Sequence, residues 1–129
     1  MSQGRILVVD DEPDVRRLLE VVLGRQGYEV ITVGSGLEAL VIAQREEPDL
    51  ILLDIMMEGM DGWEVLKVLK MEERTRTIPV VIVSARVEPK DKIRGLQEGA
   101  VDYITKPFSV RDVAESLQVL LTANGEPGT

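Results

Sequence analysis

The 129-residue sequence contains no histidine and no cysteine. The lack of histidine excludes a serine–histidine triad, a histidine-ligated zinc site and a phosphohistidine on this chain. The lack of cysteine excludes disulfides, thiolate metal sites and a cysteine nucleophile. Functions that depend on either side chain are therefore ruled out.

Positive charge is also scarce, with 15 lysines and arginines against 23 acidic residues and a net charge of −8. An acidic domain is poorly suited to nucleic acid, so we expect no direct nucleic-acid partner. No apolar run approaches the ~18 residues of a membrane span, and the first residues lack the apolar region of a signal peptide. We therefore expect a cytoplasmic chain with no membrane partner.

Hydrophobic residues make up 44% of the chain, which fits one domain of this length. Folding at this size buries roughly two-thirds of the chain surface, enough for a core without disulfides. We expect the domain to cover residues 1–122. The remaining residues, 123–129, read as a flexible tail or a severed linker.

Apolar runs and helical periodicities alternate along the chain. The run at Leu50–Asp54 has no polar alternation, which is typical of a strand buried on both faces. Four similar runs predict the other strands, at Arg5–Val9, Glu29–Val33, Pro79–Ser84 and Val101–Thr105. Apolar residues at helical spacing predict five helices between and after the strands, marked by Val15 to Leu23, Leu37 to Val41, Val65 to Leu69, Ile93 to Leu96, and Val113 to Leu121. Strict alternation of this kind predicts an α/β fold, a parallel sheet with helices on both faces.

Five polar residues follow or end the predicted strands. Because the carboxyl ends of parallel strands share one edge, we expect these residues to meet there: Asp10, Asp11, Asp54, Ser84 and Lys106. Each has an ordinary explanation alone, as a helix-start acid, a strand terminator or a solvated lysine. Their convergence on one edge favours a functional site.

Three carboxylates at one edge repel each other unless a cation joins them. Oxygen ligands of this kind suit Mg²⁺, which accepts one or two carboxylates together with waters and phosphate oxygens. Lys106 supplies a positive charge for a phosphoryl group, and Ser84 a hydroxyl. In that setting a carboxylate can attack phosphorus and form an aspartyl phosphate.

Two other patterns are better explained by packing and capping. Gly34–Ala39 matches a dinucleotide-binding G-x-G-x-x-A motif, but it follows the second predicted strand instead of the first. Ser35 and Glu38 have the spacing of a helix-capping box, which explains the segment without a cofactor. Around the loop after Asp54, the side chains of Trp63, Met56, Met57 and Met60 are interpreted as packing.

Several motifs resemble the receiver domain of bacterial two-component response regulators. The resemblance covers about residues 4 to 122 and rests on Ile6–Pro13, Leu53–Met57, Gly59–Gly62, Val83–Ala85 and Gly99–Phe108. It implies a flavodoxin-like, doubly wound sheet of five parallel strands in the order 2-1-3-4-5 with five helices.

The resemblance implies a role for each residue at the expected edge. Asp54 would accept a phosphoryl group from a phosphohistidine on a sensor histidine kinase or phosphotransfer protein. Asp10, Asp11, Asp54 and the backbone carbonyl of Met56 would hold Mg²⁺.

The remaining roles concern the response to phosphorylation. Lys106 would pair with the phosphoryl oxygens and precede a cis peptide bond to Pro107, Ser84 would be the switch hydroxyl, and Tyr103 the switch aromatic. The switch would repack the face formed by the fourth helix, fifth strand and fifth helix, where an output domain or partner protein would dock.

Two positions depart from the family pattern or vary within it. Glu58 stands where the family usually has proline, which predicts a looser and more negative loop after the acceptor. Arg86 lies where members vary their dephosphorylation rate; it would either shield the acyl phosphate or be solvated, and we favour the second.

We expect a phosphorylation-controlled signalling switch and not an enzyme acting on other substrates. The alternative, a phosphatase or phosphotransferase, normally needs a second acid two residues after the nucleophile, where this chain has Met56. A scaffold that is never phosphorylated is disfavoured because every site residue is present. Arg111 is the only base of the last helix, so we expect a monomer or a weak, phosphorylation-dependent dimer.

Overall fold

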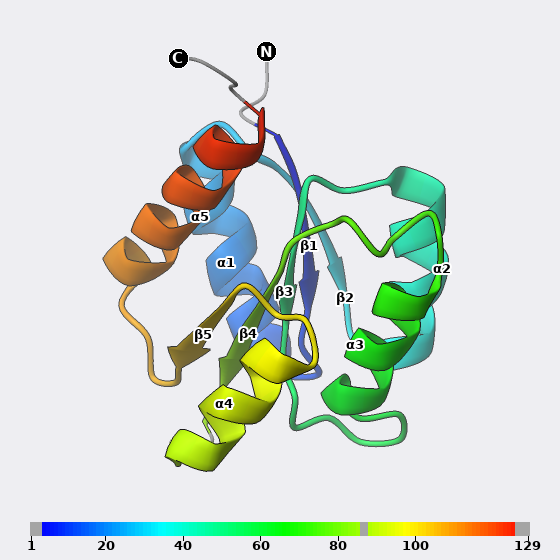
Figure 1. The fold of residues 1–129 in the computed structure, drawn as a ribbon. Helices are drawn as coiled ribbons and strands as arrows, with labels where there is room; N and C mark the ends of the chain where they lie inside the picture. The colour runs from blue at the N-terminus through cyan, green and yellow to red at the C-terminus, as the bar shows by residue number, and fades with distance from the viewer. Residues whose placement is uncertain (1–3, 86–87, 126–129) are drawn as a thin grey trace.

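The structure is a computed structural model that describes residues 4–85 and 88–125. Five strands alternate with five helices along the chain (Figure 1). The strands are β1 (Arg5–Val9), β2 (Glu29–Val33), β3 (Leu50–Leu53), β4 (Val80–Ser84) and β5 (Asp102–Thr105). The helices are α1 (Pro13–Arg25), α2 (Gly36–Glu46), α3 (Gly62–Met71), α4 (Pro89–Gln97) and α5 (Val110–Gly125).

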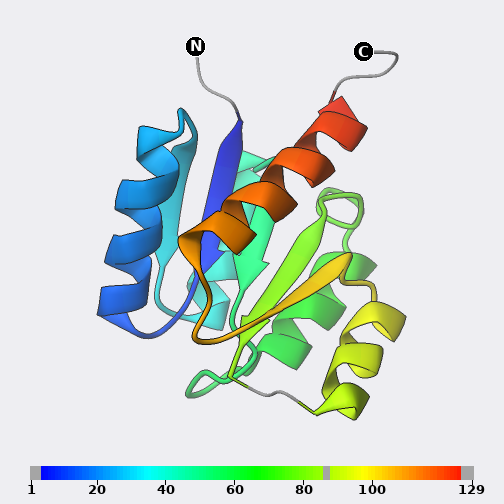
Figure 2. The same ribbon diagram turned by 90° about the vertical axis from the view of Figure 1, so that its left-hand side faces the viewer.

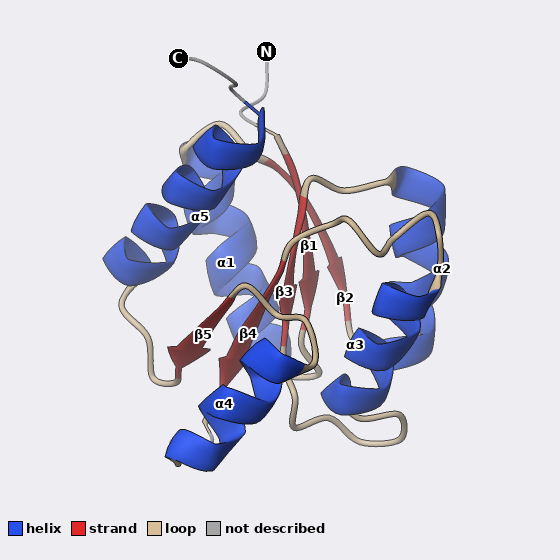
Figure 3. Cartoon of the chain, in the orientation of Figure 1, coloured by secondary structure: helices blue, strands red, loops and turns tan. Residues whose placement is uncertain are grey.

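All neighbouring strands are parallel, and the sheet order is β2-β1-β3-β4-β5. Both the flavodoxin-like order and the alternation predicted from the sequence are confirmed. The strand arrows of Figure 3 point the same way, so the loops that follow them meet along one edge of the sheet. The sheet order places β1 and β3, which end just before Asp10 and Asp54, inside the sheet with a strand on each side.

The helices form a layer on each face of the sheet. One core cluster contains Ile6 and Val8 of β1 with side chains of α1 and α5, and the other contains Leu7 and Val9 with side chains of α2 and α3. Figure 2 shows α1 and α5 on the opposite side of the sheet from α3 and α4. Successive strand side chains point to opposite faces. Both faces of β1 are covered, and this explains its unbroken apolar run.

In two helices, apolar residues that the sequence predicts to face the core are exposed. Leu37 and Val41 of α2 are 66% and 55% exposed, whereas Ala39 and Ala43 are buried. The helix packs closely: a Cβ on Gly36 would lie 2.7 Å from Val65 Cγ2 of α3. Small residues therefore form the closest contacts of α2, and Leu37 and Val41 point outward. Leu40 and Ile42 are partly buried and pack against the core.

The same reversal occurs in α4. Ile93 and Leu96 are both more than half exposed, and the buried residues of the helix are Asp91 and Gly95. A Cβ there would lie 2.8 Å from Ile82 Cδ1 and 3.3 Å from the Tyr103 ring. The helix thus approaches β4 and β5 through a glycine, and its apolar side chains are left on the surface.

The expected domain end at residue 122 falls within α5, which continues to Gly125. Among the described residues, no helix is long and apolar enough to cross a membrane.

Candidate phosphoacceptor site

Two buried aspartates lie side by side where β1 and β3 end. The strands pair in parallel with Val9 opposite Leu53, so the residues that follow, Asp10 and Asp54, emerge together at the edge of the sheet. The Asp54 backbone N–H donates to the Val9 carbonyl at 2.9 Å and fixes this position. The two aspartates are only 2% and 3% exposed.

Each aspartate is oriented by a backbone amide two residues further on. Asp10 Oδ1 accepts from the Glu12 N–H, and Asp54 Oδ1 accepts from the Met56 N–H, both at 2.9 Å. Their Oδ2 atoms face the ammonium group of Lys106. The turn after each strand thus fixes one carboxylate oxygen and leaves the other for an ionic partner.

Lys106 is the positive member of the site. Its Nζ lies 2.8 Å from Asp10 Oδ2, 3.2 Å from Asp54 Oδ2 and 3.4 Å from Glu12 Oε1. The backbone of Lys106 is held at the end of β5 by a 2.8 Å bond from its N–H to the Ser84 carbonyl, and the bond to Pro107 is cis, as predicted.

Burial perturbs both partners. Burial raises the pKa of Asp54, and the nearby Asp10 charge adds to this, while the Met56 amide and Lys106 act in the opposite direction. For Lys106, burial favours the neutral amine, but its bonds to Asp10 and Asp54 outweigh burial and raise its pKa. Lys106 is therefore cationic at neutral pH, and an ionised Asp54 carries a cost of burial that cations offset.

The acidic cluster differs in one member from the predicted set. Carboxylate oxygens of Asp10, Glu12 and Asp54 lie within 4.8 Å of one another, a grouping that can hold a metal ion. The Asp11 carboxylate instead accepts from the Glu58 N–H at 3.4 Å. We did not predict Glu12 as a site residue, although it directly follows Asp10 and Asp11, because acids at a helix start are common.

The two predicted switch residues lie on neighbouring strands. Ser84 is fully buried at the end of β4, paired with Thr105 of β5. Tyr103 is partly buried and packs against the core cluster that includes Ile82. Ser84 thus lies at the site edge, and the Tyr103 ring lies beside Gly95 of α4.

The loop that joins β3 to α3 buries the side chain of Met57, and Trp63 at the start of α3 is buried with it; each is 8% exposed. The guanidinium of Arg94 from α4 lies 4.0 Å from the centre of the Trp63 ring. Met60 packs against the same core, so the predicted packing role is confirmed for Met57, Met60 and Trp63. The same prediction is wrong for Met56, whose side chain is 51% exposed. Its position on the outer side of the loop leaves it without a core to fill.

The segment Gly34–Ala39 has the predicted capping role. The Glu38 N–H donates to Ser35 Oγ at 3.3 Å at the start of α2. A Cβ on Gly36 would lie 2.7 Å from Val65 Cγ2 and 3.1 Å from the Met60 carbonyl oxygen, so close packing explains this glycine without a cofactor. The other position singled out in the sequence, Arg86, lies outside the described residues.

Carboxylates at the ends of β1 and β3, a lysine after β5 and a buried hydroxyl on β4 are what the receiver resemblance implied. The family model for the response regulator receiver domain matches residues 6–118. The chain belongs to this family. The predicted receiver fold and the function in two-component signalling are thereby confirmed, and the alternative as a separate enzyme gains no support.

Individual relatives agree with the assignment. The receiver domain is 46% identical to the alkaline phosphatase synthesis transcriptional regulatory protein PhoP of Bacillus subtilis, over 91% of this chain and 48% of that protein. It is 42% identical to the phosphate regulon transcriptional regulatory protein PhoB of Pseudomonas aeruginosa, over 95% of this chain and 53% of that protein. The chain thus spans about half the length of these curated relatives.

Solved structures show the same fold. The receiver domain of the Francisella response regulator 1452 superposes with a TM-score of 0.88 at 30% identity, covering 94% of this chain and 98% of that one. The chemotaxis protein CheY4 of Vibrio cholerae gives 0.87 at 32% identity, covering 92% and 98%.

Proposed function

We propose that Asp54 is the phosphoacceptor of this receiver domain. The observation that carries the proposal is the contact of Asp54 Oδ2 with Lys106 Nζ at 3.2 Å. Asp54 is buried where β3 ends, next to β1. A carboxylate oxygen of Asp54 would attack phosphorus, forming an O–P bond while the bond from phosphorus to the donor nitrogen breaks. Lys106 would pair with the phosphoryl oxygens, since its ammonium already faces that carboxylate.

The site also fits a divalent cation by its donor set. Among the described residues, the carboxylates of Asp10, Glu12 and Asp54 share the Lys106 ammonium and make a hard-oxygen site that suits Mg²⁺. We propose Asp10, Asp11, Asp54 and the Met56 carbonyl as ligands, with Glu12 nearby. When bound, Mg²⁺ would neutralise charge on the carboxylates and the phosphoryl oxygens.

A phosphodonor would approach beside Lys106. A mainly apolar groove of about 370 Å³ adjoins the site there and includes Val15, Leu18, Pro107 and Phe108. Leu18 of α1, one of the lining residues, is 45% exposed. We propose that a sensor histidine kinase or phosphotransfer protein docks in this groove and presents its phosphohistidine to Asp54.

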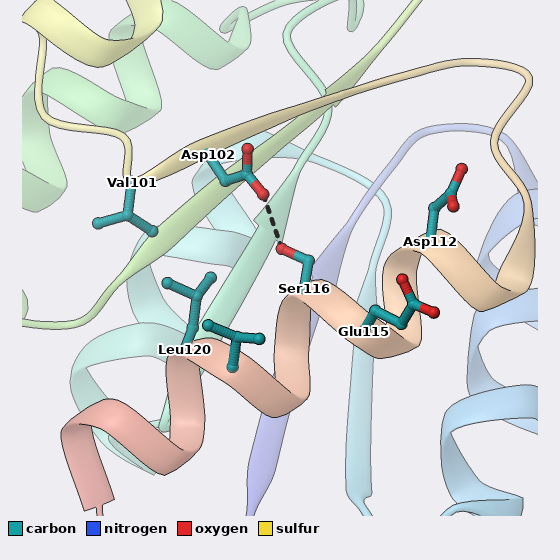
Figure 4. Close-up of a pocket in the computed structure, with 7 residues that line it drawn as sticks. Val101, Asp102, Asp112, Glu115, Ser116 and Leu120 are labelled. Carbon is teal, nitrogen blue, oxygen red and sulfur yellow. Dashed lines mark hydrogen bonds between the residues drawn. The ribbon is translucent and has the colours of Figure 1, made fainter.

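The proposed output surface is the face of α4, β5 and α5. In this face Ser116 Oγ of α5 donates to Asp102 Oδ2 of β5 at 2.8 Å, and the carboxylates of Asp112 and Glu115 lie along the same helix (Figure 4). Phosphorylation would draw Ser84 toward the acceptor and allow Tyr103 to turn inward. The size of this shift is limited by the difference in phosphoryl contacts between the two states.

Partners beyond the kinase remain proposals. The relatives PhoP and PhoB are transcriptional regulators about twice as long, and so we propose that residues 1–122 control an output domain or a partner protein. The net charge of −8 supports the proposal that this domain does not itself contact nucleic acid. A cytoplasmic location and a monomer, or a weak phosphorylation-dependent dimer, also stay predictions.

The test uses acetyl phosphate as donor and intact-mass measurement as readout. With Mg²⁺, the wild type and Asp61→Asn should each gain one phosphoryl group, and Asp54→Asn should gain none. Asp61 is a matched control, because it lies in the same loop and caps α3 with a side-chain oxygen that asparagine retains. Equal labelling of Asp54→Asn would refute the assignment.

A further inference from the structure

Two amides of the loop between β3 and α3 bind carboxylates of the site. The Met56 N–H donates to Asp54 Oδ1 at 2.9 Å, and the Glu58 N–H donates to Asp11 Oδ2 at 3.4 Å. The second bond connects the loop after β3 to the loop after β1, 47 residues apart in the chain. It is long and exposed, so it is weaker than the first.

Asp11, which makes the Glu58 contact, lies outside the group of converging acids. The described carboxylates that converge within 4.8 Å are those of Asp10, Glu12 and Asp54, and Asp11 is not among them. Asp11 instead lines a groove of about 350 Å³ together with Met56, Glu58 and other residues of the loop. Its carboxylate thus contacts the loop after β3 and lies outside the cluster of the other acids.

We propose that the Glu58 backbone N–H is a positioning group that withholds Asp11 from a divalent cation. The cation would have to break this hydrogen bond before Asp11 could join Asp10 and Asp54. This inference rests on the proposed function, in which Asp11 is a metal ligand. Every residue except proline supplies an N–H at this position, so the backbone and not the exposed Glu58 carboxylate performs the role.

The matched variants are Glu58→Ala and Glu58→Pro. Both remove the carboxylate, but only the second removes the N–H. Mg²⁺ alone is titrated into each full chain, with fluorescence of Trp63 as the readout; Trp63 is the sole tryptophan and lines the same groove as Asp11. We expect Glu58→Pro to bind Mg²⁺ about two- to fivefold more tightly than Glu58→Ala, the range for releasing one weak hydrogen bond.

Proline also stiffens the loop, so the comparison is repeated in an Asp11→Ala background. There the two variants should bind Mg²⁺ equally, because no Asp11 carboxylate remains to be released. A gain that persisted in this background would overturn the inference and assign the effect to loop stiffness. Thermal unfolding without metal verifies that each variant folds.

The remaining outcomes are distinguishable. Equal or weaker Mg²⁺ binding by Glu58→Pro than by Glu58→Ala would overturn the positioning role while leaving the metal site intact. If neither variant nor the wild type responded to Mg²⁺ by fluorescence or by thermal shift, the metal part of the proposed function would fail, and this inference with it.

Discussion

Gly62 is the position where the fold depends most visibly on a missing side chain. It is the first residue of α3, and its N–H donates to the Ile55 carbonyl at 3.0 Å. A Cβ there would lie 2.4 Å from the Asp54 carbonyl oxygen and 2.5 Å from Ile55 Cα. Both of these atoms are backbone, so neither can rotate away. Gly62→Ala must therefore move α3 or the acceptor segment.

Overpacking of this kind costs about 1–3 kcal/mol, and the upper part of the range applies because backbone has to shift. Gly24→Ala is the matched control. Gly24 lies inside the last turn of α1, and nothing lies within 4 Å of a Cβ built on it. Helix propensity and a smaller loss of backbone entropy should make that variant more stable by about 0.5–1 kcal/mol.

Urea unfolding of the two variants and the wild type measures these free energies directly. We expect opposite signs, with thermal midpoints separated by on the order of 10 °C for a domain of this size. Gly62→Ala should also be phosphorylated more slowly, because the added methyl group displaces the backbone carbonyl of Asp54, the proposed acceptor. Wild-type stability in Gly62→Ala would refute the close approach of α3 to Asp54.

Three further predictions concern charge and stacking. Burial raises the pKa of Asp54 above its ordinary 3.8, so the folded state loses stability as pH rises through the raised pKa and Asp54 ionises. Asp54→Asn should therefore be more stable than wild type at pH 7, and thermal scans should show this difference in stability disappearing below about pH 4. Asp11→Asn should weaken Mg²⁺ binding in a fluorescence titration, and an unchanged affinity would leave the residue only a helix-start role. Arg94→Ala should expose the Trp63 ring, red-shift its emission and cost about 0.5–1 kcal/mol; an unaltered spectrum would contradict the stacking.

Most of the fold could be predicted because its signals are local. Unbroken apolar runs mark strands covered on both faces, and β1 and β2 begin and end where the sequence indicated. The edge shared by Asp10, Asp54 and Lys106 followed from the parallel topology, although these residues lie up to 96 positions apart.

What could not be predicted depends on distances between elements. The outward direction of Leu37 and Val41 follows from the close contact of α2 and α3 at Gly36, which the periodicity of one helix does not encode. Glu12 lies in the acidic cluster, and Asp11 instead accepts a hydrogen bond from the Glu58 N–H of another loop. Neither loop reveals this contact alone.

The central claim, that Asp54 carries the phosphoryl group, is tested most directly by locating the modified residue. After reaction with acetyl phosphate and Mg²⁺, borohydride reduction converts an aspartyl phosphate to homoserine, and peptide sequencing by mass spectrometry identifies the position. The account predicts homoserine at residue 54 and at no other aspartate. Homoserine at residue 10, 11 or 61 with residue 54 unmodified would contradict it.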